Sequence, residues 1–172
     1  HLDQVLRFSD PAEAHASLAL RSGDIGALGY YLDHQRIHVV DPETATGQLL
    51  DAWRTDRNAG LDALMLAPTR DQVAALNAAA RQARLAGRRD GRETALADGN
   101  QASRGDVILT RRNDRTLISG ELAWVRNGDR WTVTHVHHDG SLDVQHLRNH
   151  NRLTLPADYV RETVELGYAT TI

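Results

Sequence analysis

Apolar positions recur at helical spacing in three segments of the first hundred residues. Each segment opens on a capping signal, namely Asp10-Pro11, Asp41-Pro42 and the box that starts at Thr69. Each also runs to a glycine, the residue that most often follows the end of a helix. The pattern therefore predicts three helices, over residues 11–23, 42–60 and 70–87.

Two short apolar runs lie between these helices. Ile37–Val40 and Ala63–Ala67 have the length and composition of buried strands. Helices that alternate with buried strands are typical of an α/β layer with parallel strands. We therefore expect the first part of the chain to be such a layer.

The spacing changes after Gly105, where short stretches rich in Val and Thr are separated by turn dipeptides. Asn127-Gly128 and Asp139-Gly140 are strong hairpin signals. Four or five strands in this part predict a small β-barrel, with residues 87–104 as a surface connection. A two-residue loop at Asp139-Gly140 would place His137 opposite Leu142 and His135 opposite Val144.

Composition excludes several kinds of chemistry. All 20 basic residues are Arg, and the chain has neither Lys nor Cys. A Walker-type phosphate loop and Schiff-base chemistry both need Lys, and thiolate catalysis needs Cys. The net charge is −3, and no apolar run approaches the about 20 residues of a membrane span. We expect a cytoplasmic protein with no membrane partner.

The third predicted helix carries the best candidates for anion binding. Thr69 and Arg70 lie where a strand ends and a helix begins, which is where open α/β sheets hold ligands. Polar residues continue along one ridge of this helix, and they are Arg70, Asn77, Arg81, Arg84 and Arg88. The ridge could follow a phosphate backbone. The alternatives are an ordinary solvated helix face and a Thr69 that only caps the helix.

Other candidates carry less information. His135 and His137 alternate on a strand, but no third metal ligand has a defensible spacing, so we interpret them as structural or surface residues and predict no metal site. No Gly-x-Ser-x-Gly elbow is present, which argues against an autonomous enzyme. Arg7 precedes a capped helix and is either an arginine finger for a phosphate held by another domain or a surface residue.

Several blocks, in this order, resemble one family. They are LDQVLRF, LMLAPTRDQVAALN, GDVILTRRN, VRNGDRWTV and ELGYATTI. The series is similar to the second RecA-like domain of RecD-type superfamily-one helicases, and most closely to the helicase half of conjugative relaxases such as TraA, TrwC and TraI. A RecD-like exonuclease V alpha subunit fits the same blocks. Each block alone is weak, and their order and spacing carry the resemblance.

The resemblance implies a fold and a domain order. Residues 1–100 would be part of RecA-like domain 2A, with a parallel sheet of the P-loop NTPase type. Residues 101–162 would be an inserted SH3-like 2B barrel, and residues 163–172 a returning 2A strand that stops within motif V. The chain would then be a fragment of an ATP-dependent translocase that moves 5′ to 3′ on single-stranded DNA in conjugation.

The resemblance also implies roles for single residues. Arg7 would contact the γ-phosphate of ATP, which the parent protein would hold with Mg²⁺ mainly on its first RecA-like domain. The fragment alone would bind neither and would have no ATPase activity. The residues implied in weak binding of single-stranded DNA are Thr69, Arg70, Asn77, Arg111, Arg112, Asn127, Thr170 and Thr171.

Two readings compete with the helicase interpretation. The chain could be a non-enzymatic adaptor whose SH3-like barrel binds a protein or a nucleic acid, with the α/β part as scaffold. It could also be a metal sensor built on the histidines. The apolar strand that stops at Ile172 makes a homodimer plausible, because an unpaired strand edge can pair with a second copy. The sequence does not separate a relaxase helicase from a repair helicase.

Overall fold

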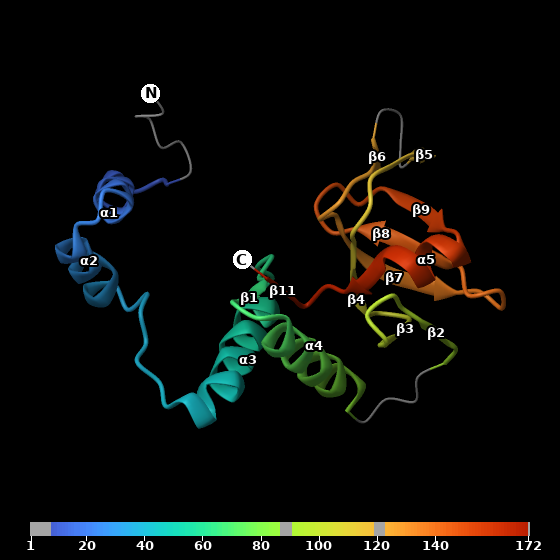
Figure 1. The fold of residues 1–172 in the computed structure, drawn as a ribbon, viewed down its shortest axis with the longest axis horizontal. Helices are drawn as coiled ribbons and strands as arrows, with labels where there is room; N and C mark the ends of the chain where they lie inside the picture. Colours follow the sequence, from blue (N-terminus) through green and yellow to red (C-terminus); the bar gives the residue numbers. More distant parts are fainter. Residues whose placement is uncertain (1–7, 87–90, 119–122, 172) are drawn as a thin grey trace. The chain divides into compact units, whose positions relative to one another are not determined.

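The computed structural model describes residues 8–86, 91–118 and 123–171 of the chain (Figure 1). The chain forms two compact units, His1–Ala45 and Thr46–Ile172. Arg7 and Arg88, both candidates from the sequence, lie outside the described residues. Each unit is described by itself.

The first unit contains three short helical elements, α1 (Pro11–Arg21), η1 (Ile25–Ala27) and α2 (Leu28–Asp33). The predicted cap is confirmed, because Asp10 Oδ1 accepts a hydrogen bond from the Ala12 backbone N–H at 2.8 Å. The other carboxylate oxygen accepts one from the Tyr30 hydroxyl at 2.5 Å. This hydrogen bond lowers the pKa of Asp10 and is the main cause that raises the pKa of Tyr30 to about 12. One side chain thus caps α1 and ties α2 to it.

The strand predicted at Ile37–Val40 is wrong. Residues 36–40 have no regular secondary structure, and Val39 is 95% exposed. A strand gains stability from a hydrogen-bonded neighbour and a buried face. Among the described residues this apolar run has neither.

The second unit begins with an α/β part. It contains most of α3 (Pro42–Asn58), which begins in the first unit, then β1 (Met65–Ala67), α4 (Arg70–Leu85) and, at the end of the chain, β11 (Ala169–Thr171). The two predicted helices are confirmed to within two residues. β1 and β11 pair in parallel, with Leu66 opposite Thr170. Val73, Leu76 and Ala80 of α4 are buried, as their spacing predicts.

The RecA-like parallel layer is not shown by this structure. In the described part of the chain, parallel pairing is limited to β1 and β11. The sheets are small, and the second expected strand of the layer, at Ile37–Val40, is not formed. The fold class is therefore a mixture of helices and small sheets that includes a barrel.

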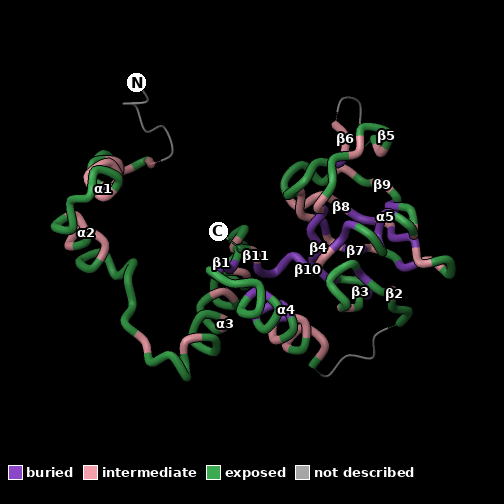
Figure 2. The backbone as a smooth tube through the Cα atoms, in the orientation of Figure 1, coloured by how far each residue is buried: buried purple, intermediate pink, exposed green. Residues whose placement is uncertain are grey.

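The barrel lies in the chain between α4 and β11. Its main sheet is antiparallel with the order β10-β4-β7-β8-β9, and two further pairs are β2-β3 and β5-β6. The elements are β2 (Glu93–Ala95), β3 (Gln101–Ser103), β4 (Val107–Thr110), β5 (Asp114–Ile118), β6 (Trp124–Val125), β7 (Arg130–Val136), β8 (Leu142–His146), β9 (Arg152–Leu155), α5 (Ala157–Thr163) and β10 (Val164–Leu166). Buried positions are concentrated in this sheet and in α5, around the fully buried Trp131 (Figure 2).

The two predicted hairpins have different outcomes. Asp139-Gly140 does join two paired strands, β7 and β8. Asn127-Gly128 forms a turn in which Gly128 has a φ of 92°, but β6 pairs with β5 while β7 pairs with β4 and β8. The hairpin predicted at Asn127-Gly128 is therefore wrong, because the best partners of its two strands lie elsewhere in the chain.

The predicted register of the β7-β8 hairpin is also wrong, by one residue. Val136 pairs with Leu142 and His135 pairs with Asp143, and a bulge lies between Val133 and His135. The loop is longer than two residues, because Ser141 O accepts a hydrogen bond from His137 N at 2.9 Å. A shift of one residue turns every side chain to the other face. The apolar residues thus fill the core and the histidines face outward.

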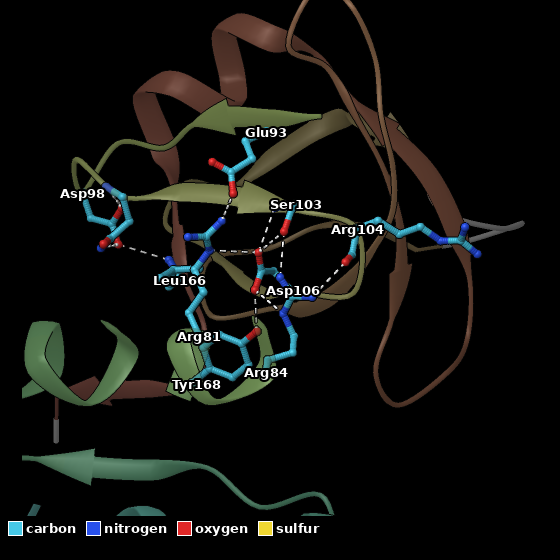
Figure 3. Close-up of polar contacts among 10 residues, drawn as sticks. Arg81, Arg84, Glu93, Asp98, Ser103, Arg104, Asp106, Leu166 and Tyr168 are labelled. Atoms are coloured by element: carbon cyan, nitrogen blue, oxygen red, sulfur yellow. Dashed lines mark hydrogen bonds and ion pairs between the residues drawn. The ribbon is translucent and has the colours of Figure 1, made fainter. Parts of the chain in front are cut away.

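The carboxylate of Asp106 joins α4 to the barrel (Figure 3). Asp106 is 0% exposed, and it accepts hydrogen bonds from Arg81 Nε at 3.2 Å and from Arg84 Nε at 2.7 Å. Ser103 donates its backbone N–H at 2.8 Å and its hydroxyl at 3.0 Å. The Tyr168 hydroxyl donates the fifth bond, at 2.6 Å. A buried carboxylate is stable only when it is paired in this way.

These contacts correct the predicted ridge of α4. Arg81 also pairs with the Glu93 side chain, and Arg84 donates to the Ser103 hydroxyl at 2.7 Å. Both guanidiniums are therefore turned into the protein rather than toward a phosphate backbone. Burial, followed by the charge of Asp106, raises the pKa of Tyr168 above its ordinary value.

Asn77 makes the second connection from α4. The residue is 3% exposed, and its Oδ1 accepts hydrogen bonds from the backbone N–H groups of Tyr168 at 3.1 Å and Ala169 at 2.8 Å. Its Nδ2 donates to Leu166 O at 3.2 Å and to Ala169 O at 3.4 Å. Asn77 therefore holds the backbone between β10 and β11, and its amide is fully used within the protein.

We predict that Asp106→Asn lowers the free energy of unfolding by about 3–5 kcal/mol, because it removes the charge opposite two half-buried guanidiniums. Urea unfolding followed by circular dichroism measures the change. Asp56→Asn, at an exposed position on α3, is the control and should stay within about 0.5 kcal/mol of the parent protein. Equal effects of the two substitutions would contradict a special role for Asp106.

Two glycine substitutions test the packing of the junction between β10 and β11. A Cβ at Gly167 would lie 2.7 Å from Ile108 C and 2.8 Å from Ile108 O, whereas a Cβ at Gly47 on α3 meets nothing within 4 Å. We predict that Gly167→Ala destabilises the protein by about 1–3 kcal/mol through overpacking. Gly47→Ala should stabilise it by about 0.5–1 kcal/mol, since alanine favours helix. Thermal unfolding of both variants measures the difference, and the prediction fails if Gly167→Ala is neutral.

Candidate functional site

Two grooves on the second unit share one side chain, that of Arg111. The larger, called here the helix groove, has a volume of about 580 Å³ and is lined by residues that include Arg70, Asn77, Arg111, Glu165 and Thr171. The smaller, called the turn groove, has a volume of about 280 Å³ and is lined by residues that include Arg111, Gly128, Arg130, Arg148 and Thr170. Arg111 therefore lies where the two grooves meet.

The position of Arg111 is set by contacts on both sides. It directly follows β4, and its backbone N–H donates to Thr163 O at 2.8 Å. Its Nε donates to Glu165 Oε2 at 2.6 Å, and its Nη2 donates to Thr170 Oγ1 at 3.3 Å. The guanidinium thus connects the barrel to β11. Its side chain is still 34% exposed, which leaves part of it open to a ligand.

One end of the helix groove is the start of α4. Thr69 caps the helix, because its Oγ1 accepts a hydrogen bond from Gln72 N at 3.2 Å. Ala67 and Thr171 are the last residues of the parallel strands β1 and β11, so both strands end at the same edge. The carboxyl edge of parallel strands beside a helix N-terminus is a common position for an anionic ligand. The predicted placement of Thr69 and Arg70 at such an edge is confirmed.

The charges of the helix groove are mixed. Asp71, Asp98 and Glu165 lie in its lining together with Arg70 and Arg111. Asp98 accepts a hydrogen bond from Leu166 N at 3.1 Å, and Glu165 is paired with Arg111. Within the described parts of the chain, Arg70 is exposed and has no carboxylate partner. Arg70 is therefore the cation of this groove that is most available to a phosphate.

The turn groove is richer in cations than in carboxylates. Arg130 pairs with the Asp62 side chain and donates to Ala63 O at 3.3 Å. Arg148 Nε lies 3.9 Å from Asp62 Oδ2, a long contact for a side chain that is 84% exposed. The lining thus contains three guanidiniums, those of Arg111, Arg130 and Arg148, against the two carboxylates of Asp62 and Asp129.

The eight residues implied in DNA binding are only partly brought together. Five of them line the two grooves, and these are Arg70, Asn77, Arg111, Thr170 and Thr171. Asn77 is among the five, but its amide is occupied by β10 and β11. Thr69 lies next to the helix groove as the cap of α4, and Asn127 lies on the turn beside Gly128, where its backbone N–H donates to Asn113 Oδ1 at 2.8 Å.

Arg112 serves a different part of the barrel. Its Nη1 donates to Glu162 Oε2 at 3.2 Å, and its guanidinium lies 5.1 Å from the centre of the Tyr159 ring. Its carbonyl oxygen accepts a hydrogen bond from the Tyr159 hydroxyl. Burial raises the pKa of that hydroxyl. Arg112 therefore packs α5 against the end of β4, outside both grooves.

Sequence reasoning missed Arg130 and Arg148. Arg130 follows the Asn127-Gly128 turn directly, and this position next to a candidate is a usable signal. Its partner Asp62 lies 68 residues earlier in the chain, however, and no local pattern connects the two. Arg148 stands alone in a polar segment, and nothing in that segment marks it as part of a groove.

In the described part of the chain, His135 of β7 and His137 just after it are not joined by a third metal ligand. His137 Nε2 lies 3.0 Å from Asp143 Oδ1, and the His135 and His137 rings are 4.7 Å apart. Hydrogen bonds from Thr154 and then from His137 lower the pKa of Asp143. In residues 8–86, 91–118 and 123–171, no group of three or more His, Cys, Asp or Glu side chains is placed to hold a metal ion.

None of the helices that the structure describes has the length and apolar character needed to cross a membrane.

Comparison with known proteins concerns the barrel. Residues 94–165 match the family described as the Rv2311 SH3-like barrel domain. No curated protein matches the chain. The match covers the inserted barrel and carries no link to RecD-type helicases or relaxases. Residues 94–165 are thus an SH3-like barrel domain of the Rv2311 family.

Proposed function

We propose that the second unit is a binding module for single-stranded DNA. An SH3-like barrel is consistent with a binding module. The observation that carries the proposal is the position of Arg111, which lines both grooves and contacts Thr170 of β11. A strand bound at Arg111 would reach the start of α4 on one side and the guanidiniums of the turn groove on the other.

The proposed contacts divide into two kinds. At the start of α4, the first backbone N–H groups have no partner within the helix, and together with Arg70 they offer donors to one phosphate. In the turn groove, Arg130 and Arg148 offer guanidiniums to further phosphates. The carboxylates beside these groups reduce the local positive potential. Binding should therefore be weak and strongly dependent on salt.

We further propose, on the resemblance alone, that the parent protein is a translocase of the RecD type. Its first RecA-like domain would hold ATP and Mg²⁺, and Arg7 would reach the γ-phosphate from this chain. The chain has no Lys, so the Walker lysine would have to come from another domain. This supports a parent protein in which one domain binds ATP and this chain binds the strand. In this proposal the chain contributes strand binding to a motor that it does not complete.

A protein-binding adaptor is the second candidate, and exposed leucines around β1 favour it. Leu61 is 56% exposed and Leu66 is 52% exposed. A second copy that pairs with β11 would be one such partner. Light scattering after size-exclusion chromatography distinguishes the cases, since a dimer whose mass falls on Leu66→Ser substitution would support the adaptor.

We predict that Arg70→Gln weakens binding of a fluorescent oligo(dT) and lowers the slope of log K against log salt by about 0.7, the value for one phosphate contact on a single strand. Arg104→Gln is the matched control. The Arg104 carbonyl accepts a hydrogen bond from Arg84, and the Arg104 side chain points away from Asp106 (Figure 3). Arg84 lies about 21 Å from Arg70 along the α4 axis, at 1.5 Å per residue. Fluorescence anisotropy measures both variants.

Either of two outcomes would contradict the proposed function. One is that the unsubstituted chain does not bind oligo(dT) at low salt. The other is an equal loss of affinity in the Arg70 and Arg104 variants, which would indicate a general charge effect without a site at the start of α4.

We also predict that the chain does not hydrolyse ATP, with or without single-stranded DNA, because it has no Lys for a Walker loop. A phosphate-release assay measures turnover. DNA-stimulated hydrolysis by the 172-residue chain would overturn the assignment of the nucleotide site to another domain.

A further inference from the structure

A tryptophan flanked by two arginines lies outside both grooves, on the β5-β6 pair. The Arg115 guanidinium lies over the Trp124 ring at 5.4 Å from its centre, and the Arg126 guanidinium lies over it at 5.2 Å. We propose that these three residues, called here the Trp124 platform, bind one nucleotide of a single strand, with the ring and guanidinium planes stacking its base. This proposal rests on the proposed function and extends it to a second contact point.

The backbone directs the platform away from the core. Val125 is 0% exposed, so its side chain faces inward. Neighbouring side chains of a strand point to opposite faces, and Trp124 and Arg126 therefore share the other face. Trp124 is only half-buried, and both arginines are exposed. Figure 1 shows β5 and β6 extending beyond the main sheet of the barrel.

The two guanidiniums, those of Arg115 and Arg126, have no ion-pair partner in residues 8–86, 91–118 and 123–171. In contrast, Arg81, Arg111 and Arg130 each pair with a carboxylate. The described acidic residues nearest to them in the sequence, Asp114 and Asp129, accept other hydrogen bonds. Asp114 accepts hydrogen bonds from Thr116, and Asp129 accepts one from the backbone N–H of Arg126 at 2.8 Å.

The combination of groups selects for a nucleotide. Base stacking on an aromatic ring and phosphate binding by Arg are the two interactions on which sequence-independent single-strand binding depends. The cation–π contacts hold both guanidiniums in place, which lowers the entropy lost on binding. An acidic peptide would use the charges but would leave the ring without a stacking partner, so a nucleotide fits the platform better.

The platform also continues the proposed path. Arg126 is two residues from Gly128, which lines the turn groove. The turn between them is fixed to the barrel, because Gly128 N donates to Thr110 O at 2.8 Å and Thr110 Oγ1 donates to Arg126 O at 2.7 Å. In the proposed path, a strand that leaves the turn groove past this turn would reach the Trp124 platform.

The test compares oligo(dT) with an oligonucleotide of equal length that contains abasic sites, using the full chain. Trp124→Ala should weaken oligo(dT) binding roughly 5- to 140-fold, the range for loss of one stacked base, and should leave the affinity for the abasic strand nearly unchanged. Trp124→Phe should recover part of the loss. Binding of oligo(dT) to the unsubstituted chain should quench tryptophan fluorescence. This quenching should persist in the matched control Trp53→Phe but disappear in Trp124→Phe.

A second pair of variants guards against misfolding of Trp124→Ala. Arg115→Gln and Arg126→Gln should each weaken the binding of both strands. Thermal unfolding should show that both variants keep the fold. The proposed role of the platform is overturned if the unsubstituted chain binds oligo(dT) and the Trp124→Ala variant binds both strands with the same affinities. If the unsubstituted chain binds neither strand, the proposed function is overturned as well. Binding of poly-glutamate, but not of DNA, in a way that requires Trp124 would assign the platform to an acidic peptide and overturn the nucleotide proposal.

Discussion

The buried carboxylate of Asp106 is the contact on which the arrangement of the second unit depends. The barrel is inserted between α4 and β11, so it must be attached to both without a continuous sheet. Asp106 receives a guanidinium from each of two turns of α4 and the hydroxyl of Tyr168, which lies just before β11. Because a buried carboxylate without these donors would be strongly unfavourable, the three segments are held in one geometry. Asn77 adds the second attachment, from the same helix to the backbone around β11.

This attachment determines which part of α4 is available for a ligand. The second half of the helix is used for architecture, since Arg81 and Arg84 face the barrel. The first half of the helix, from Arg70 to Asn77, borders the helix groove, and Thr69 caps it there. The arginines of the unit therefore fall into two groups, according to whether they pair with a carboxylate of the fold. Some neutralise a carboxylate of the fold, and a few, among them Arg70, Arg115 and Arg126, keep their charge available. The planar, always-charged guanidinium serves both purposes, as a fork for a carboxylate and as a plane that stacks on an aromatic ring.

Much of the local structure could be predicted from the sequence. Capping residues and glycines placed α1, α3 and α4, because these signals act within one turn of the chain. The small barrel followed from short β-rich stretches and turn dipeptides. The surface connection predicted at residues 87–104 was wrong, because its described part forms β2 and β3 and buries Leu96, Ala102 and Ser103. The strand at Ile37–Val40 and the Asn127-Gly128 hairpin were wrong for one reason. A strand exists only with a partner, and the identity of that partner depends on distant residues. The β7-β8 register failed because Ser141 lengthens a loop that a dipeptide rule treats as two residues.

The candidate site shows the same division between local and distant information. Sequence by itself determined the start of α4, the position of the Thr69-Arg70 junction between a strand and a helix, and the absence of any Lys or Cys chemistry in the chain. Only the tertiary structure decided which arginines are free and which are paired. Asp106 lies 25 residues from Arg81, and Asp62 lies 68 residues from Arg130. A charge stripe on one helix carries no information about such partners, because an ion pair depends on distance in space and not on separation along the chain.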